Sequence, residues 1–90
     1  KEPEEEKHKK NLQERIDEVC VEYKLTPREK EFIELIYSGK SNKEIAEILF
    51  LSESTVKTHI YNIFRKMNVK SRVGVIYIVN EENEDELPRH

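Results

Sequence analysis

The sequence predicts an all-α domain, and three features of its 90 residues favour that class. Apolar residues recur at helical spacing in several segments, and no segment alternates apolar and polar residues as a half-buried strand does. Only two glycines and three prolines occur, so the frequent turns of a sandwich or barrel are missing. Charged residues make up 39% of the chain and hydrophobic residues 36%, which is enough for a modest helical core.

Residues 1–23 are predicted to form a charged linker followed by one helix. Residues 1–10 lack apolar periodicity, so we expect a disordered linker, and because the chain does not begin with methionine we expect an upstream portion to be missing. Apolar residues at helical spacing then predict an amphipathic helix over residues 11–23. These residues are Leu12, Ile16, Val19, Cys20 and Tyr23. We expect this helix to pack on the main body, with coupling or dimerisation as the alternative.

Capping signals predict the starts of the next two helices. Thr26 and Glu29 form a capping box, and Gly39 can end that helix in the left-handed conformation. Ser41 and Glu44 form a second capping box, which begins a shorter helix. The predicted apolar face of this shorter helix consists of Ile45, Ala46, Ile48 and Leu49.

A longer helix is predicted over residues 53–67, with Ser52 as its cap. Its apolar residues fall on one side and predict a buried stripe. The stripe consists of Val56, Ile60, Ile63 and Met67. A short apolar helix, a tight turn and a longer helix with a polar outer face are typical of a helix-turn-helix. Phe50 stands where the commonest form of this turn has glycine, so we expect a longer, apolar turn.

The last helix is predicted over residues 72–80, with Ser71 as its cap; a strand is the alternative, because β-branched residues crowd the segment. The segment is apolar nearly all round, whereas a helix with one buried face should show a polar side. We therefore expect Val73 and Tyr77 to contact a second copy of the chain, with burial under the 11–23 helix as the alternative. The acidic tail, residues 81–90, is expected to be disordered.

The outer face of the 53–67 helix combines positive charge with hydroxyl and amide groups. These groups belong to Ser54, Lys57, Thr58, Tyr61, Asn62 and Arg65. Such a face suits the major groove of DNA, although an ordinary solvated face has the same polarity. Charge favours DNA, because residues 24–72 hold ten basic and six acidic residues, a net +4, while the flanks carry −3 and −4. Since +4 is modest, we expect one copy to bind weakly and to act in a dimer or a tethered array.

Other kinds of site are not indicated by the sequence. Cys20 is the single cysteine, which excludes an internal disulfide and favours a packed thiol. His8, His59 and His90 are scattered, so we expect no metal and no cofactor. No nucleophile with a base and an orienting partner can be recognised, so we expect no enzyme. No apolar run approaches eighteen residues, and we expect a soluble, cytoplasmic domain, with a membrane tether elsewhere in the parent protein as the alternative.

Four motifs carry a resemblance to a known family: LTPRE at 25–29, SNKEIA at 41–46, STVKTH at 54–59 and SR at 71–72. With them, residues 25–79 closely resemble the DNA-binding effector domain of the LuxR family of bacterial transcription regulators. The resemblance implies a four-helix LuxR-type helix-turn-helix domain at residues 24–80, preceded here by the additional 11–23 helix. It also implies that the third helix enters the major groove and that the fourth supplies a dimer contact. The positions that match base contacts are Lys57, Thr58 and Tyr61.

Contacts to the DNA backbone are expected from polar residues around these positions. The candidates are Lys43, Ser54, Thr55, Arg65, Lys66 and Lys70. The expected partners are double-stranded DNA, a second copy of the chain, and an upstream sensory or receiver domain. Two alternatives are a sigma-factor-like promoter-reading domain and a protein interaction module. The SR motif and the apolar helix after it favour the LuxR-type domain.

Overall fold

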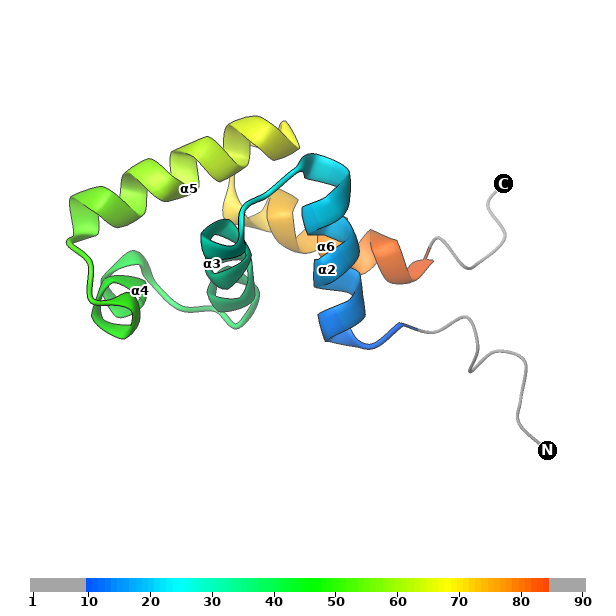
Figure 1. Ribbon diagram of the computed structural model, residues 1–90, viewed down its shortest axis with the longest axis horizontal. Coiled ribbons are helices and arrows are strands. Elements are labelled where there is room, and N and C mark those ends of the chain that lie inside the picture. The colour runs from blue at the N-terminus through cyan, green and yellow to red at the C-terminus, as the bar shows by residue number, and fades with distance from the viewer. Residues whose placement is uncertain (1–9, 85–90) are drawn as a thin grey trace.

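The computed structural model describes the backbone of residues 10–84 and the side chains of residues 10–81, and this part contains five helices and no strand (Figure 1). The predicted all-α class is confirmed, and the strand alternative for the last segment is wrong. Most of the predicted linker and the last part of the tail, residues 1–9 and 85–90, lie outside the described residues. The helices are α2 (Leu12–Tyr23), α3 (Pro27–Tyr37), α4 (Asn42–Leu49), α5 (Glu53–Met67) and α6 (Arg72–Glu84).

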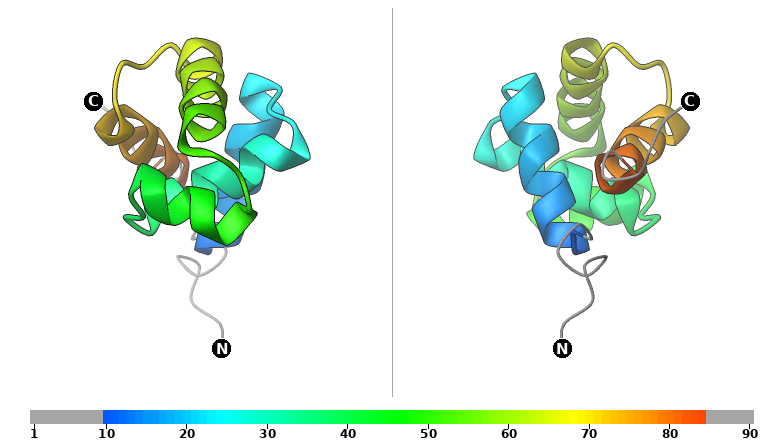
Figure 2. Two further views of the ribbon diagram at one scale, coloured as in Figure 1. Left: turned by 90° about the vertical axis from the view of Figure 1, so that its left-hand side faces the viewer. Right: turned by 90° about the vertical axis from the view of Figure 1, so that its right-hand side faces the viewer.

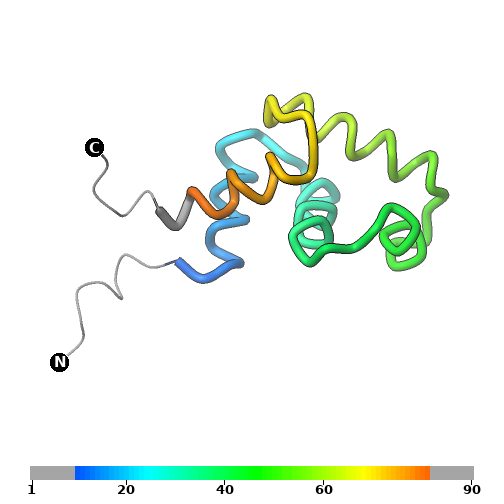
Figure 3. Tube along the Cα trace, turned by 180° about the vertical axis from the view of Figure 1, so that it is seen from behind, coloured from blue at the N-terminus to red at the C-terminus, as the bar shows by residue number. Residues whose placement is uncertain are grey.

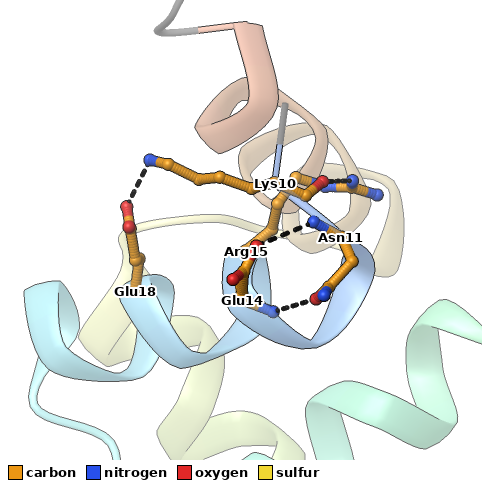
Figure 4. A network of polar contacts seen from close by, with 5 residues as sticks. All are labelled: Lys10, Asn11, Glu14, Arg15 and Glu18. Atoms are coloured by element: carbon orange, nitrogen blue, oxygen red, sulfur yellow. Dashed lines mark hydrogen bonds and ion pairs between the residues drawn. The ribbon is translucent and has the colours of Figure 1, made fainter. Parts of the chain in front are cut away.

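Side-chain caps define where the first helices begin. The two predicted capping boxes are present at Thr26 and Ser41, and a third, unpredicted one lies at Asn11. Just before that third box, the Lys10 ammonium lies 2.6 Å from the Glu18 carboxylate, and Arg15 Nη1 donates to the Lys10 carbonyl at 2.8 Å (Figure 4). Lys10, the last residue of the predicted linker, therefore contacts two side chains of α2, those of Arg15 and Glu18.

A different pair of helices lies at each end of the longest axis of the molecule. α4 and the start of α5 lie at one end, and the start of α2 and the end of α6 lie at the other (Figures 1 and 3). The core between them is filled from all five helices. Its fully or almost fully buried side chains are Ile16, Val19, Phe32, Ile33, Ile36, Ile45, Val56, Ile63, Met67, Val75 and Val79. The default role predicted for α2 is confirmed, because it packs on α3 and α6.

The turn between α4 and α5 corrects one expectation. Only Phe50, Leu51 and Ser52 separate the two helices, so the longer turn was wrong. Phe50 itself takes the left-handed conformation, at φ 59°, and its N–H donates to the Ala46 carbonyl. That conformation costs a residue other than glycine about 1–2 kcal/mol. The phenyl ring gains no burial in return, since Phe50 is 92% exposed, and Ile48, expected in the core, is 45% exposed.

The start of α6 is fixed by Arg72 and Gly74. Arg72 Nη1 donates to the Lys40 carbonyl at 2.7 Å, and its Nη2 donates to the Asn42 side chain. A Cβ on Gly74 would lie 2.7 Å from the Cβ of Val69, so only glycine lets the helix approach the preceding turn this closely. The helix also continues four residues past its predicted end to Glu84, which means that the start of the expected disordered tail is helical.

An ion pair joins the beginning of α3 to the last turn of α5. Glu29 is only 7% exposed, and its carboxylate accepts from the Lys66 ammonium at 2.8 Å and from the Thr26 backbone N–H at 2.9 Å. Burial raises the pKa of the Glu29 carboxyl, but these hydrogen bonds outweigh that effect and hold the pKa below its ordinary value of 4.5. The same carboxylate therefore caps one helix and anchors another.

We expect this pair to make stability depend on pH. A carboxyl whose pKa is lowered by folding stabilises the fold above its unfolded-state pKa, and that stabilisation is lost as the pH falls through the folded-state pKa. The melting temperature of the wild type should therefore fall more steeply below about pH 4.5 than that of Glu29→Gln, as measured by circular dichroism. Glu31→Gln, at an exposed glutamate nearby, is the control. Equal pH profiles for the wild type and Glu29→Gln would contradict the pairing.

Candidate nucleic-acid interface

The rotation of α5 about its axis is set by burial on one side. Val56 and Ile63 are fully buried, and Ile60 and Met67 are 7% and 2% exposed, as the periodicity predicted. The opposite face is not covered by any described helix (Figures 1 and 2). All six residues predicted for that face are exposed: Ser54, Lys57, Thr58, Tyr61, Asn62 and Arg65.

The three residues expected at base edges, Lys57, Thr58 and Tyr61, lie together on this exposed face. The Thr58 hydroxyl donates to the Ser54 carbonyl at 3.1 Å, so its proton is used within the helix. Its methyl group and its oxygen lone pairs remain available to a ligand. Tyr61 is 62% exposed, and the guanidinium carbon of Arg65 lies 5.8 Å from the centre of its ring.

The residues expected at phosphates fall into two groups. Lys43, at the start of α4, and Ser54 and Thr55, at the start of α5, lie exposed at helix N-termini, where backbone N–H groups favour anions. Ser52 donates to the Thr55 hydroxyl at 2.9 Å, which orders this first turn. Arg65 and Lys66 lie in the last turn of α5, and Lys70 lies in the turn that follows it.

Lys66 has a role that the sequence did not reveal, because its ammonium is paired with Glu29. The partners are 37 positions apart, and each had a sufficient local explanation, a capping box for one and a solvated helix face for the other. Arg72 was recognised only as part of the SR motif, and the structure shows it holding the loop before α4. An arginine directly after a helix cap was the one available signal for such a role.

The two residues expected at a dimer contact are both exposed on α6. Val73 is 73% exposed and Tyr77 is 61% exposed. The alternative, burial under α2, is wrong, because both side chains stay exposed although α2 packs on α6, whose buried residues include Val75 and Val79. The outward face of α6 thus remains accessible for a further contact.

The described residues offer little for other chemistry. Among them, no three metal-binding side chains lie together, and none of their helices is both long and apolar enough to cross a membrane. His59 lies at the core edge, with its ring centre 4.8 Å from that of Phe32. Burial raises the pKa of the half-buried Cys20 thiol and so disfavours the reactive thiolate.

Comparison with known proteins identifies the family to which this sequence is similar. A family profile described as "Bacterial regulatory proteins, luxR family" matches residues 23–79. The chain is 51% identical over 57 residues to a probable csgAB operon transcriptional regulatory protein of Salmonella typhimurium, covering 63% of this chain and 26% of that protein. It is 47% identical over 58 residues to the nitrate/nitrite response regulator protein NarL of Escherichia coli, covering 64% and 27%.

A third relative is the uncharacterized transcriptional regulatory protein YhcZ of Bacillus subtilis, which is 56% identical over 50 residues, covering 56% of this chain and 23% of that protein. The chain thus spans about a quarter of the length of these curated relatives. No solved structure gives a significant match. The matched segment starts at the last residue of α2 and contains α3, α4, α5 and the apolar part of α6, as far as Val79. Because the match covers the four helices around the exposed polar face, the chain belongs to the luxR family of bacterial regulatory proteins and carries its helix-turn-helix DNA-binding domain.

Proposed function

We propose that this domain binds double-stranded DNA sequence-specifically, as the effector domain of a bacterial transcription regulator, with α5 in the major groove. The observation that carries the proposal is the polar, cationic face of α5, which is exposed over its whole length while the opposite face is buried. An α-helix fits the major groove, where each base pair presents a distinct pattern of donors and acceptors. Two of the relatives are named as transcriptional regulatory proteins, and this supports the assignment. We propose no catalytic role.

The chemistry of each side chain suggests its part in this complex. Lys57 can donate to guanine O6 and N7, and Thr58 can place its methyl group against a thymine methyl. Tyr61 is the third candidate at the base edges. Phosphates would be held by Lys43, Ser54, Thr55, Arg65 and Lys70. Lys66 would add a contact only if its ammonium left the Glu29 carboxylate or bound a phosphate and that carboxylate together.

Lys57 provides the test of base recognition. Selection of bound sites from random duplexes should yield a defined motif for the wild type, and Lys57→Ala should lose about 1–3 kcal/mol of discrimination at one base pair of it. Lys30→Ala is the control, because it removes the same charge from a lysine that pairs with Asp17 on α2. Unchanged affinity and selectivity in Lys57→Ala, measured by fluorescence anisotropy, would contradict the proposal that α5 lies in the major groove.

We also propose that two copies bind DNA together through α6. Val73 and Tyr77 lie one helical turn apart and are both exposed, and two copies would double the modest positive charge of one domain. A symmetric pair of domains would read two half-sites about one turn of DNA apart, or closer if the domains touch directly.

The dimer contact can be tested by sedimentation on a duplex with two half-sites. The wild type should bind as two cooperative copies, whereas the variant with Val73→Glu and Tyr77→Glu should bind as independent monomers, because four like charges would meet at the contact. Ser38→Glu, at an exposed site that ends α3, is the control for added charge. Full cooperativity in a folded double variant would exclude this face and direct attention to α2.

The parent protein is proposed to be cytoplasmic and to carry a sensory or receiver domain before α2. Two observations support this arrangement: the chain spans about a quarter of its curated relatives, and one of them is named as a response regulator. In that arrangement α2, packed on α3 and α6, would link the input domain to the proposed dimer face.

A further inference from the structure

Arg65 is used differently from the other arginines in the described part of the chain. Those others donate to carbonyl, carboxylate or amide oxygens of the protein: Arg15, Arg28 and Arg72. The guanidinium of Arg65 makes no such hydrogen bond or ion pair with any residue that the structure describes, and it lies instead 5.8 Å from the centre of the Tyr61 ring. The charge of Arg65 is therefore held in place while its donors stay unoccupied.

The contact with Tyr61 has the geometry of a cation–π interaction between residues one helical turn apart. A guanidinium is planar, so an aromatic ring can hold its face while its N–H groups point outward along the edge. Such a contact restricts the rotamers of a long side chain and lowers the entropy cost when a ligand is bound. A free lysine or arginine on a helix surface has no comparable restraint.

Tyr61 and Arg65 line the same open groove of about 460 Å³ at the end of α5, and Lys70 lines it as well. The last carbonyls of a helix repel anions, so two cations in this position favour an anionic ligand that the helix end alone would exclude. The combination of an aromatic wall, a guanidinium fork and an ammonium group matches the chemistry of a phosphodiester.

The length of α5 places Arg65 outside the part of the helix that reads bases. A recognition helix contacts bases mainly with its N-terminal residues. At 1.5 Å per residue, Arg65 lies about 16 Å along the axis from Ser54, which exceeds the major-groove width of about 12 Å. If the start of α5 enters the groove, its last turn lies against the sugar-phosphate backbone.

We propose that this groove binds a DNA phosphodiester and that Tyr61 is a positioning residue, which holds Arg65 toward that phosphate. The inference rests on the proposed DNA-binding function and deepens it by assigning one subsite. In this proposal Tyr61 acts mainly through its ring, which lies under the Arg65 guanidinium, and not through a contact of its hydroxyl with a base edge. Lys70 supplies the second charge of the subsite.

The salt dependence of binding separates these two roles of Tyr61. Removing one cation–phosphate interaction makes the slope of log K against log salt shallower by about 0.9, whereas removing a neutral hydrogen bond to a base leaves the slope unchanged. We would measure anisotropy on a duplex carrying the selected motif, between about 50 and 200 mM salt. Arg65→Ala should give the shallower slope, and Arg28→Ala, at an exposed arginine paired with Glu31, should keep the wild-type slope.

Tyr61→Leu and Tyr61→Gln remove no charge, yet both should move the slope toward that of Arg65→Ala, with an affinity loss of about two- to fivefold at the lower salt. Tyr61→Phe keeps the ring and should keep the wild-type slope and affinity. In the Arg65→Ala background, Tyr61→Leu should not change the slope further. Circular dichroism checks that each variant is folded. Tyr61 and Arg65 are both exposed, so replacing either residue leaves the core unchanged.

Two outcomes would overturn the inference alone: a wild-type slope in Tyr61→Leu and Tyr61→Gln, or an affinity loss in Tyr61→Phe as large as that in Tyr61→Leu. The second outcome would return Tyr61 to a base contact through its hydroxyl. Failure of the wild type to bind any duplex would instead overturn the proposed function, and this subsite with it.

Discussion

One-sided burial of α5 is the constraint on which the rest of the structure depends. Val56 and Ile63 are completely buried against the other helices, so the rotation of a fifteen-residue helix is fixed by its apolar stripe. A change of one residue position would turn the helix by about 100° and bring Lys57 toward the core. Burying an unpaired charge costs several kcal/mol, so the hydrophobic stripe, rather than any polar contact, keeps the cationic face turned outward.

Polar contacts then hold the neighbouring elements around α5. The Glu29–Lys66 pair joins the start of α3 to the last turn of α5, and Arg72 joins the start of α6 to the loop before α4. Tyr37 donates to the Asn80 side chain at 2.6 Å and so connects α3 with α6 farther along. These contacts connect α6 to α3 and α3 to α5. A shift of α6, the proposed dimer helix, would therefore be transmitted through α3 to α5, the helix proposed to read DNA.

Local signals made the helices predictable, and non-local packing did not. The capping boxes and the period of the buried stripe depend on residues a few positions apart, so they located the starts of α3 and α4 and the exposed face of α5. The pairing of Lys66 spans 37 positions, and no local pattern reports it. Phe50 predicted a longer turn, whereas only three residues join α4 to α5 and Phe50 takes the left-handed conformation that glycine usually adopts. Residues 81–84 continue α6 because glutamate is a good helix former and neither glycine nor proline occurs among them.

The central claim is that the free face of α5 is the surface that meets DNA. Chemical-shift mapping of the isotope-labelled chain, titrated with a duplex that carries the selected motif, tests it residue by residue. We predict that the largest backbone amide shifts occur at Ser54, Lys57, Thr58 and Tyr61, with smaller changes around Lys70. Unchanged amides along α5, together with large shifts confined to α2, would contradict it.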